Sequence, residues 1–561
     1  MTGRNTAVGF GLLALALALP AQTPHQVNLA NTPLNAPTTS PEHGSQSQAD
    51  QAFSAAKEIE DPKSRVEAFQ KFLKDYPDTR SAHDLAGGEL IDAAVAGWPN
   101  DLTKAVALAK ETAASATGMN QVYLSTQFAV ALLDKDMALP DAETFAHKAF
   151  DGLSYPLFAD GVHKTYATAI RPPIEGSIEN LYRTAQAHIL TILGQICVKE
   201  NKTSEGQKFL EQSLEKNAYS TETAHSLAEL AAASGDKDKE LAYRTQGYLA
   251  HANKADRTKL EALYRAAHNG SLDGLEPYLD TQYRKDFPKQ TALEEYAGTP
   301  HRTVLLELLT GSKCPPCLGM DMAFDQLLER YPRRDVAVLM YHQNRAGPDP
   351  MTNYPSLATF AYYTGVSAPT TILAGHVELG GGFAERSHEF ALQLSHDVDE
   401  QLAIPAEADF TLKASEKGHD IPVSVQIKRI QSTSNHLTLK LAVVDKLLTY
   451  SGETGVRFHP MVVRTTENIP LTSTKPQTIE HTFNQDQILA DIKKYHDDFE
   501  KGDDKDNVDG TYRWPIRLEK LGGNGLAVAA FIQDDDTKKV LQAGWVDLSR
   551  APNEKIVEAK R

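Results

Sequence analysis

Cysteine and tryptophan are scarce in this chain, which has three of each among 561 residues. So few cysteines exclude a disulfide framework as the main source of stability in a chain of this length. No phosphate-binding glycine loop, zinc-protease motif or Gly-x-Ser-x-Gly sequence occurs, so these common nucleotide-binding and hydrolase signatures are missing. No block of basic residues occurs and the net charge is −17, which argues against nucleic acid or an anionic membrane as a partner.

The N-terminus has the pattern of a secretory signal. Arg4 gives a positive start, residues 7–19 form an apolar run, and Leu19-Pro20-Ala21 offers a cleavage site. The run is too short for a stable membrane anchor, and no later segment is long and apolar enough to span a bilayer. We therefore expect residues 1–21 to be a signal peptide of a protein exported to a bacterial periplasm or beyond.

The next two segments differ in composition. Residues 22–48 are rich in Gln, Thr, Pro, Ser and Asn without periodicity, so we expect a disordered linker. Residues 49–285 are dominated by Ala, Leu, Glu and Lys at helical periodicity. Residues 193–197 and 227–231 are similar segments offset by 34 residues, a period that resembles tetratricopeptide (TPR) repeats. Such arrays hold proteins or peptides; a helical domain that only packs on its neighbour is the alternative.

Residues 405–551 contain short alternating runs that predict about seven strands and an immunoglobulin-like β-sandwich. Residues 534–537 join the last two strands as a hairpin, and a helix-like insert at 486–501 interrupts the domain. The acidic segment 503–510 suggests calcium, but its spacing departs from the EF-hand pattern, and a solvated loop is the simpler interpretation. Residues 552–561 form a tail.

The most informative motif is Cys314-Pro315-Pro316-Cys317, at a predicted strand-to-helix junction. Residues 303–309 form an apolar run typical of a buried strand, and residues 320–330 are typical of an amphipathic helix. Positions i and i+3 on a helix face the same way, which brings the two sulfur atoms within reach of one another. This arrangement favours a pair that alternates between dithiol and disulfide.

The two cysteines have different expected roles. Pro315 disfavours helical geometry at Cys314 and leaves it as the exposed flank of the helix start. The positive end of the helix dipole, together with Lys313, then lowers the pKa of the Cys314 thiol. We therefore expect Cys314 to be the attacking thiolate and Cys317 to resolve the mixed disulfide.

A structural disulfide and half of a zinc site are the alternatives for this motif. Zinc needs further ligands at similar spacing, but no second CxxC occurs and the spacing of His342 and His376 does not suggest them. We expect no metal and no cofactor. The third cysteine, Cys197, lies on the apolar face of a predicted helix and is expected to be buried.

The order of elements around the motif resembles the thioredoxin-like family over residues 290–404, within a predicted domain at 286–404. The segments after the motif are a buried strand at 335–341, a helix at 355–363, an Ala-Pro-Thr strand ending at 373, a turn at 374–375, a strand at 376–379, glycines at 380–382 and a helix at 384–401. The long segment 343–353 after the second strand resembles a branch of secreted bacterial members.

The resemblance implies a thioredoxin-like fold and exchange of electrons with protein thiols and disulfides. It implies that Pro369, after Ala368, is a cis-proline that lies against the CxxC motif and binds the substrate backbone. Glu307 resembles the buried acid that assists Cys317, although it lies one residue further upstream and alternatively faces solvent. Lys313 replaces the family's usual tryptophan.

His342 ends the second strand near the expected site, where it is either a proton shuttle or a hydrogen-bonded structural histidine. The sequence therefore predicts a multidomain protein with an all-α TPR-like array, an α/β thioredoxin-like domain and an all-β sandwich. The predicted function is that of an exported thiol–disulfide oxidoreductase that acts on protein thiols and disulfides and is served by an upstream redox partner. The helical array is a candidate surface for a further protein partner. The alternative is a cell-envelope scaffold whose CxxC does not turn over. The direction of electron flow depends on the reduction potential.

Overall fold

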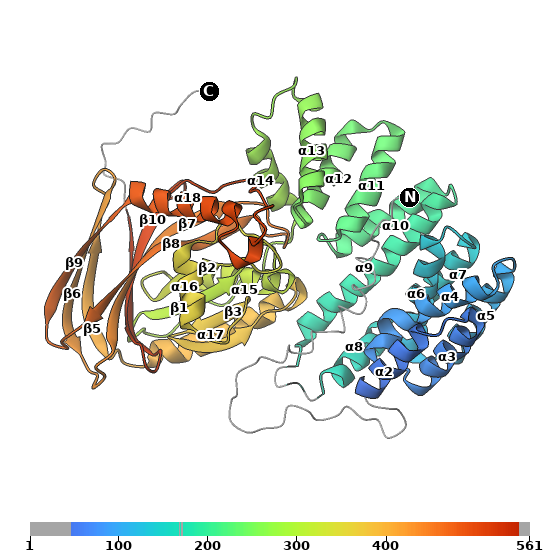
Figure 1. Ribbon diagram of the computed structural model, residues 1–561, viewed down its shortest axis with the longest axis horizontal. Coiled ribbons are helices and arrows are strands. Elements are labelled where there is room, and N and C mark those ends of the chain that lie inside the picture. The colour runs from blue at the N-terminus through green and yellow to red at the C-terminus, as the bar shows by residue number, and fades with distance from the viewer. Residues whose placement is uncertain (1–45, 168, 170–171, 549–561) are drawn as a thin grey trace. The chain divides into compact units, whose positions relative to one another are not determined.

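The computed structural model describes residues 46–548 except 168, 170 and 171. The expected signal peptide, the linker up to residue 45 and the tail at 552–561 lie outside the described residues. The described chain forms two compact units, shown in Figure 1. A helical unit extends to Ala250 and includes Ala255–Pro288, and a mostly sheet unit contains His251–Lys254 and the chain from Lys289 onward. No helix in the described ranges is both long and apolar enough to cross a bilayer.

The helical unit confirms the all-helical prediction for this part of the chain. Its elements are α2 (Gln46–Lys57), α3 (Pro62–Asp75), η1 (Ala82–Ala86), α4 (Gly87–Gly97), α5 (Leu102–Ser115), α6 (Gly118–Asp134), α7 (Leu139–Gly152), α8 (Tyr155–Thr165), α9 (Glu175–Lys199), α10 (Thr203–Lys216), α11 (Thr221–Ser234), α12 (Lys237–Ala250), α13 (Lys254–Ala267) and α14 (Leu275–Asp286). Helix α2 begins at Gln46, so the last residues of the predicted linker are helical.

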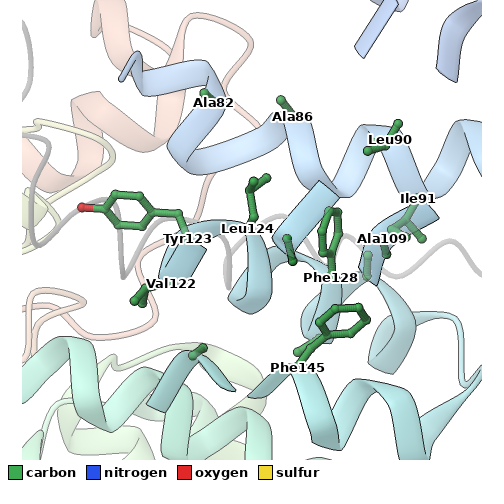
Figure 2. Packing of buried hydrophobic residues seen from close by; sticks show 14 of the residues in the cluster. Ala82, Ala86, Leu90, Ile91, Ala109, Val122, Tyr123, Leu124, Phe128 and Phe145 are labelled. Atoms are coloured by element: carbon green, nitrogen blue, oxygen red, sulfur yellow. The ribbon is translucent and has the colours of Figure 1, made fainter. Parts of the chain in front are cut away.

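One large apolar core holds α2 to α9 together. Figure 2 shows part of it, where the rings of Phe128 and Phe145 lie close together near Leu90 and Ile91. The centroids of the two rings are 5.4 Å apart. Such dense aromatic and aliphatic packing is the main favourable contribution to the stability of a helical unit.

The two similar segments found in the sequence occupy equivalent positions. Residues 193–197 lie in α9 and residues 227–231 in α11, and each helix packs against the one that follows it. A Cβ atom on Gly194 would lie 2.5 Å from Leu210 Cγ and 2.9 Å from the carbonyl oxygen of Gly206, so α9 and α10 cross too closely for a side chain there. Cys197 is fully buried, as predicted.

The second unit contains eleven strands among the described residues. Its elements are β1 (Val304–Thr310), η2 (Pro315–Cys317), α15 (Leu318–Arg330), β2 (Val336–His342), α16 (Tyr354–Tyr362), β3 (Thr370–Leu373), β4 (His376–Gly380), η3 (Ala384–Arg386), α17 (Ser387–Ala403), β5 (Ala408–Ala414), β6 (Asp420–Ile430), β7 (Leu437–Thr449), β8 (Phe458–Leu471), β9 (Gln477–Asn484), α18 (Gln485–Lys501), η4 (Lys505–Asn507), β10 (Leu526–Asp534) and β11 (Val540–Asp547). These bounds follow the predicted segments closely.

The strands form two sheets. The larger has the order β11-β10-β7-β8-β2-β1-β3-β4, and the smaller has the order β5-β6-β9. Strands β1 and β2 are parallel, β3 runs antiparallel to β1, and β8 joins the parallel edge of β2 at one paired position, Met340 with Val462. The turn between β3 and β4 has positive φ at Ala374 and Gly375, as the predicted hairpin requires.

Three apolar layers cover the larger sheet. Helix α16 packs on one face, in a cluster that runs from β1 and β2 across to β7, β10 and β11. On the other face, α15 and α17 cover β1 and β2, and the smaller sheet covers β7 and β10. Arg302 Nη2 beside β1 donates to the carbonyl oxygen of Val540 in β11 at 2.6 Å, so these two strands are linked although they are not neighbours in the sheet.

The prediction of two separate modules at 286–404 and 405–551 is wrong in one respect. The strands from both segments share one hydrogen-bonded sheet and one core, so they form a single compact unit. The local sequence pattern specifies each strand, but it carries no signal for which strand edges pair across a predicted boundary.

This shared core predicts how fragments behave. A fragment of residues 289–404 lacks β8 and loses much of the apolar cover of α16, so we expect it to remain unfolded or to aggregate. A fragment of residues 289–548 should fold and unfold in one cooperative transition. Urea unfolding followed by circular dichroism compares them, and a stable, cooperative 289–404 fragment would contradict the single-unit description.

Candidate functional site

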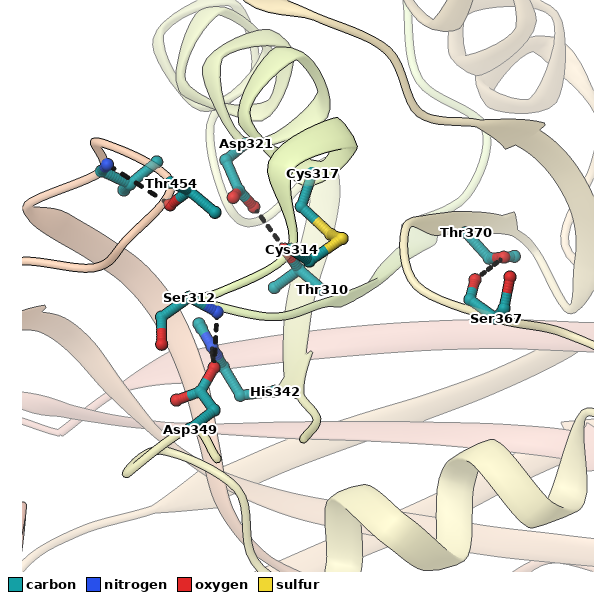
Figure 3. Close-up of a disulfide and its surroundings, with 11 residues drawn as sticks. Thr310, Ser312, Cys314, Cys317, Asp321, His342, Asp349, Ser367, Thr370 and Thr454 are labelled. Atoms are coloured by element: carbon teal, nitrogen blue, oxygen red, sulfur yellow. Dashed lines mark hydrogen bonds and ion pairs between the residues drawn. A yellow bond between two sulfur atoms is a disulfide. The ribbon is translucent and has the colours of Figure 1, made fainter. Parts of the chain in front are cut away.

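The two cysteines of the CPPC motif form a disulfide at the end of a buried strand. Strand β1 ends at Thr310, and residues 311–313 form the turn that leads to Cys314. Cys314 has extended backbone angles, and the 3₁₀ turn η2 then runs directly into α15. The structure therefore places the motif where the sequence predicts it, with both sulfur atoms at the start of a helix (Figure 3).

Cys314 is buried, which corrects the prediction of an exposed sulfur-bearing residue. It is 3% exposed and Cys317 is 0% exposed, whereas Pro315 between them is exposed. The loop between β7 and β8 packs on the turn before Cys314, where Thr454 N donates to the carbonyl oxygen of Ser312 at 3.1 Å. This loop lies more than a hundred residues away in the sequence. The backbone preference that Pro315 imposes on Cys314 therefore carries no information about the loop that packs beside it.

Lys313 is not the free positive charge that the sequence suggests. Its ammonium group is 2.7 Å from Glu453 Oε1, in the same β7–β8 loop, and lies 5.8 Å from the centre of the Tyr512 ring. Glu453 therefore opposes the field that Lys313 exerts on Cys314. The pair also holds the loop against the turn that carries the motif.

The peptide bond between Ala368 and Pro369 is cis, the isomer that the family resemblance implies. Pro369 lies beside the motif, because a Cβ atom on Gly381 would be 1.9 Å from Pro369 Cγ and 2.4 Å from the carbonyl oxygen of Pro316. The absence of a side chain at Gly381 thus allows the proline loop and the CPPC turn to approach one another.

Glu307 does not lie beside the cysteines. In β1, Leu306 points to the face that α15 covers, whereas Leu305 points to the face that α16 covers. Because side chains alternate along a strand, Glu307 is on the α16 face, where Tyr363 Oη donates to its Oε2 at 2.8 Å. The shift of one residue upstream therefore moves this acid to the opposite side of the sheet from Cys317, and it is buried there, not exposed to solvent.

A different acid, Asp321, lies on the side of the cysteines. It is on α15 one turn after Cys317, and its Oδ1 accepts a hydrogen bond from Thr310 Oγ1 at 2.8 Å. Figure 3 shows Asp321 and Thr310 beside the disulfide. Burial raises the pKa of Asp321 to about 7. Asp321 is not among the site residues predicted from the sequence, although its i+4 spacing from Cys317 indicates that the two residues share a helix face.

His342 is at the buried end of β2 and pairs with Asp349, which the sequence analysis also missed. His342 Nδ1 lies 2.8 Å from Asp349 Oδ2, and the same oxygen accepts a hydrogen bond from Ser312 N at 2.6 Å (Figure 3). Although burial opposes it, the His342 imidazole and the backbone N–H groups of Ser312 and Met351 hold the pKa of Asp349 below its usual value. The 343–353 segment thus anchors the CPPC turn.

The other candidate sites receive no support as metal centres. In the described parts of the chain, no group of three or more His, Cys, Asp or Glu side chains is arranged to hold a metal ion. In the acidic segment 503–510, Asp504 accepts a hydrogen bond from the backbone of Asp506, and Asp509 accepts one from Thr511. His376 is exposed on β4. The carboxylates of Asp504 and Asp509 stabilise turns of the 503–510 segment.

Comparisons with known proteins give little further information. No protein-family model and no curated protein matches the chain. HBP35 of Porphyromonas gingivalis aligns with a TM-score of 0.31 and 15% identity, over 46% of this chain and 80% of that chain. A crystal structure of a protein from Agrobacterium tumefaciens aligns with a TM-score of 0.29 and 15% identity, over 46% of this chain and 100% of that chain. Similarities this weak support no conclusion about function.

The contact at Gly381 gives a prediction with a matched control. Gly381→Ala places a methyl group against Pro369 and the Pro316 backbone, so we expect the free energy of unfolding to fall by about 1–3 kcal/mol. Gly380→Ala is the control, because its Cβ atom would be 4.0 Å from the nearest contact, the carbonyl oxygen of Pro369. Urea unfolding measures both variants, and equal stability of the two would contradict the close approach.

Glu307 predicts a pH dependence of stability. Burial raises its pKa from 4.5 to about 7, so its stabilising contribution is complete below about pH 4.5 and is lost as pH rises through about 7. Glu307→Gln keeps an acceptor for Tyr363 but cannot ionise. We expect it to be more stable than the wild type by on the order of 1–2 kcal/mol at pH 8, and not at pH 4, in urea unfolding. Burial also raises the pKa of Asp321, so its contribution to stability changes with pH in the same direction, and part of the pH dependence should remain in Glu307→Gln. A pH profile of stability in Glu307→Gln identical to that of the wild type would contradict the assignment.

Proposed function

We propose that this protein is a thiol–disulfide oxidoreductase that acts on protein cysteines through Cys314 and Cys317. The observation that carries the proposal is the disulfide at the start of α15, with a cis-proline packed against the same turn. A disulfide that only stabilises the fold needs neither this helix-start position nor that neighbour. The order β2-β1-β3-β4, with α15 and α17 on one face and α16 on the other, supports a thioredoxin-like assignment for this part of the unit.

In the reducing direction, the Cys314 thiolate attacks a substrate disulfide and forms a mixed disulfide, while one substrate sulfur leaves with the electron pair and takes up a proton. Cys317 then loses its proton and attacks Cys314. The Cys314–Cys317 bond forms, the mixed disulfide breaks, and the second substrate thiol leaves, so two electrons pass to the substrate. The reverse sequence oxidises a substrate dithiol.

The burial of Cys314 requires a movement before either sequence of steps. The β7–β8 loop and its Glu453 pair with Lys313 must shift to admit a substrate sulfur. Ordered loops of this kind open locally at modest free-energy cost. The exposed Pro315 marks the side from which a substrate approaches.

The proposal extends to the remaining parts of the chain. The packing of α9 with α10 and of α11 with α12, at a 34-residue offset, supports a TPR-like surface for a protein partner. The β5-β6-β9 sheet, packed on β7 and β10, supports an immunoglobulin-like layer. We further propose that the protein is exported and is recharged by an upstream redox partner, on the N-terminal pattern in the sequence.

A cell-envelope scaffold is the second candidate function. The observation that favours it is the burial of both cysteines, since a disulfide closed off from solvent turns over slowly. The two candidates differ in whether the disulfide accepts electrons from a protein or dithiol at a useful rate.

A comparison of three proteins tests the proposal. We expect the wild type and Cys197→Ser to catalyse the reduction of insulin by dithiothreitol, because Cys197 is buried in the helical unit and has no part in exchange. Cys314→Ser should lose at least 100-fold of the rate, since no thiolate remains to attack. Turbidity of the released insulin chains measures the reaction. Equal, negligible rates in all three proteins would favour the scaffold.

A further inference from the structure

The end of the sheet beside the disulfide holds more ionisable groups than the exchange reaction uses. Asp321, Asp349, His342 and His459 are all buried there. The two imidazole rings have centroids 5.2 Å apart. Burial lowers the pKa of His459 to about 3, and its Nε2 lies 2.9 Å from the carbonyl oxygen of Tyr450, so this ring stays neutral and donates there. His459 therefore has a structural hydrogen bond, and His342 remains to be explained.

His342 points toward the side of the cysteines. It is paired with Thr310 at the ends of the parallel strands β1 and β2, so both side chains leave the sheet on the same face. That face carries α15, where Thr310 donates to Asp321. Asp349 occupies Nδ1 of His342, while Nε2 is buried and has no hydrogen-bond partner among the described residues. A buried polar atom without a partner costs free energy, which argues for a use beyond stability.

We propose that His342, oriented by Asp349, is a positioning residue that controls whether the carboxyl group of Asp321 is ionised when Cys317 closes the disulfide. This inference rests on the thiol–disulfide exchange proposed above and names its proton-handling groups. Burial and the negative charge of Asp349 raise the pKa of Asp321, and the interaction with His342 lowers it and so favours the ionised carboxylate.

The charged and titratable groups around His342 come from four elements. Asp349 faces it from the 343–353 segment, Asp321 from α15 and His459 from β8, while the buried Arg457 before β8 acts on His459. His342 and Asp349 act on Asp321 in opposite directions, because His342 favours its ionised form and the charge of Asp349 disfavours it.

Ring closure begins from the mixed disulfide between Cys314 and the substrate. The thiol of Cys317 gives its proton to the Asp321 carboxylate, and the sulfur of Cys317 bonds to that of Cys314. The bond from Cys314 to the substrate sulfur breaks, and that sulfur leaves as a thiolate with the electron pair. The substrate disulfide is the only oxidant needed. An uncharged neighbour in place of His342 leaves Asp321 protonated to higher pH, and ring closure then lacks its acceptor.

The test uses His342→Asn in the full chain with Cys197→Ala, so that only two thiols react. The amide nitrogen of asparagine takes the place of Nδ1 and keeps a donor for Asp349, but the side chain has no Nε2 and cannot titrate. Fully reduced protein is mixed with dithiodipyridine in a stopped-flow instrument. The first release of thiopyridone reports attack by Cys314, and the second, independent of reagent concentration, reports ring closure by Cys317.

We expect the pH profile of the second phase to move about one pH unit upward in His342→Asn, so that ring closure at pH 6 is about tenfold slower and nearly normal at pH 9. The first phase should be unchanged. Asp321→Asn, a second variant, should slow ring closure and remove the inflection. A wild-type profile in either variant would overturn the inference and leave the exchange activity standing.

The matched control is His496→Asn. His496 is also a buried histidine with a carboxylate partner, Glu519 at 3.2 Å, and its Nε2 lies 3.1 Å from the carbonyl oxygen of Pro350, next to Asp349. Replacing His496 loosens the same 343–353 segment without changing His342. The pH profile of ring closure in His496→Asn should therefore match that of the wild type. A shift as large as that of His342→Asn overturns the inference, whereas a wild type with no first phase overturns the proposed function instead.

Discussion

The two-residue alternation of side chains in β1 and β2 decides which groups meet the cysteines. Leu306 and Thr310 leave β1 on the face that α15 covers, and His342 leaves β2 on that same face. Glu307 follows Leu306 directly, so its side chain lies on the opposite face, which α16 covers, and there it accepts a hydrogen bond from the Tyr363 hydroxyl. The chemistry beside the disulfide therefore depends on register, because a slip of one residue in either strand would exchange the two sets of polar groups.

Much of the fold was predictable from local patterns. Hydrophobic runs gave the strands and helices of the sheet unit, since a buried strand shows its burial in its own residues. The Ala374-Gly375 turn followed from the backbone angles that a tight hairpin needs. The pairing of β2 with β8 was not predictable, because edge-to-edge pairing at Met340 and Val462 depends on strands separated by over a hundred residues, and neither strand's composition specifies its partner.

The candidate site was predictable where the motif itself carries the geometry, and not where distant segments contribute. The position of Cys314 and Cys317 at a helix start follows from four consecutive residues. The burial of Cys314 does not, since the loop that carries Glu453 comes from another part of the chain. Asp349 lies in an irregular segment, and no periodicity marks it as the acceptor that joins the Ser312 backbone to His342.

The single paired position between β2 and β8 has a mechanical consequence. The disulfide belongs to the half of the sheet that contains β1 and β2, while the loop that packs on the turn before Cys314 connects β7 and β8 on the other half. Within the sheet the two halves share this one paired position, and contacts outside it also join them, among them the Asn353 side chain, which donates to the Val463 carbonyl oxygen at 2.8 Å, and Val540 N, which donates to the Ala374 carbonyl oxygen at 2.9 Å. Access to the sulfur atoms is therefore coupled to the far half of the sheet, because separating the loop from the turn breaks the Thr454–Ser312 hydrogen bond and the Lys313–Glu453 ion pair.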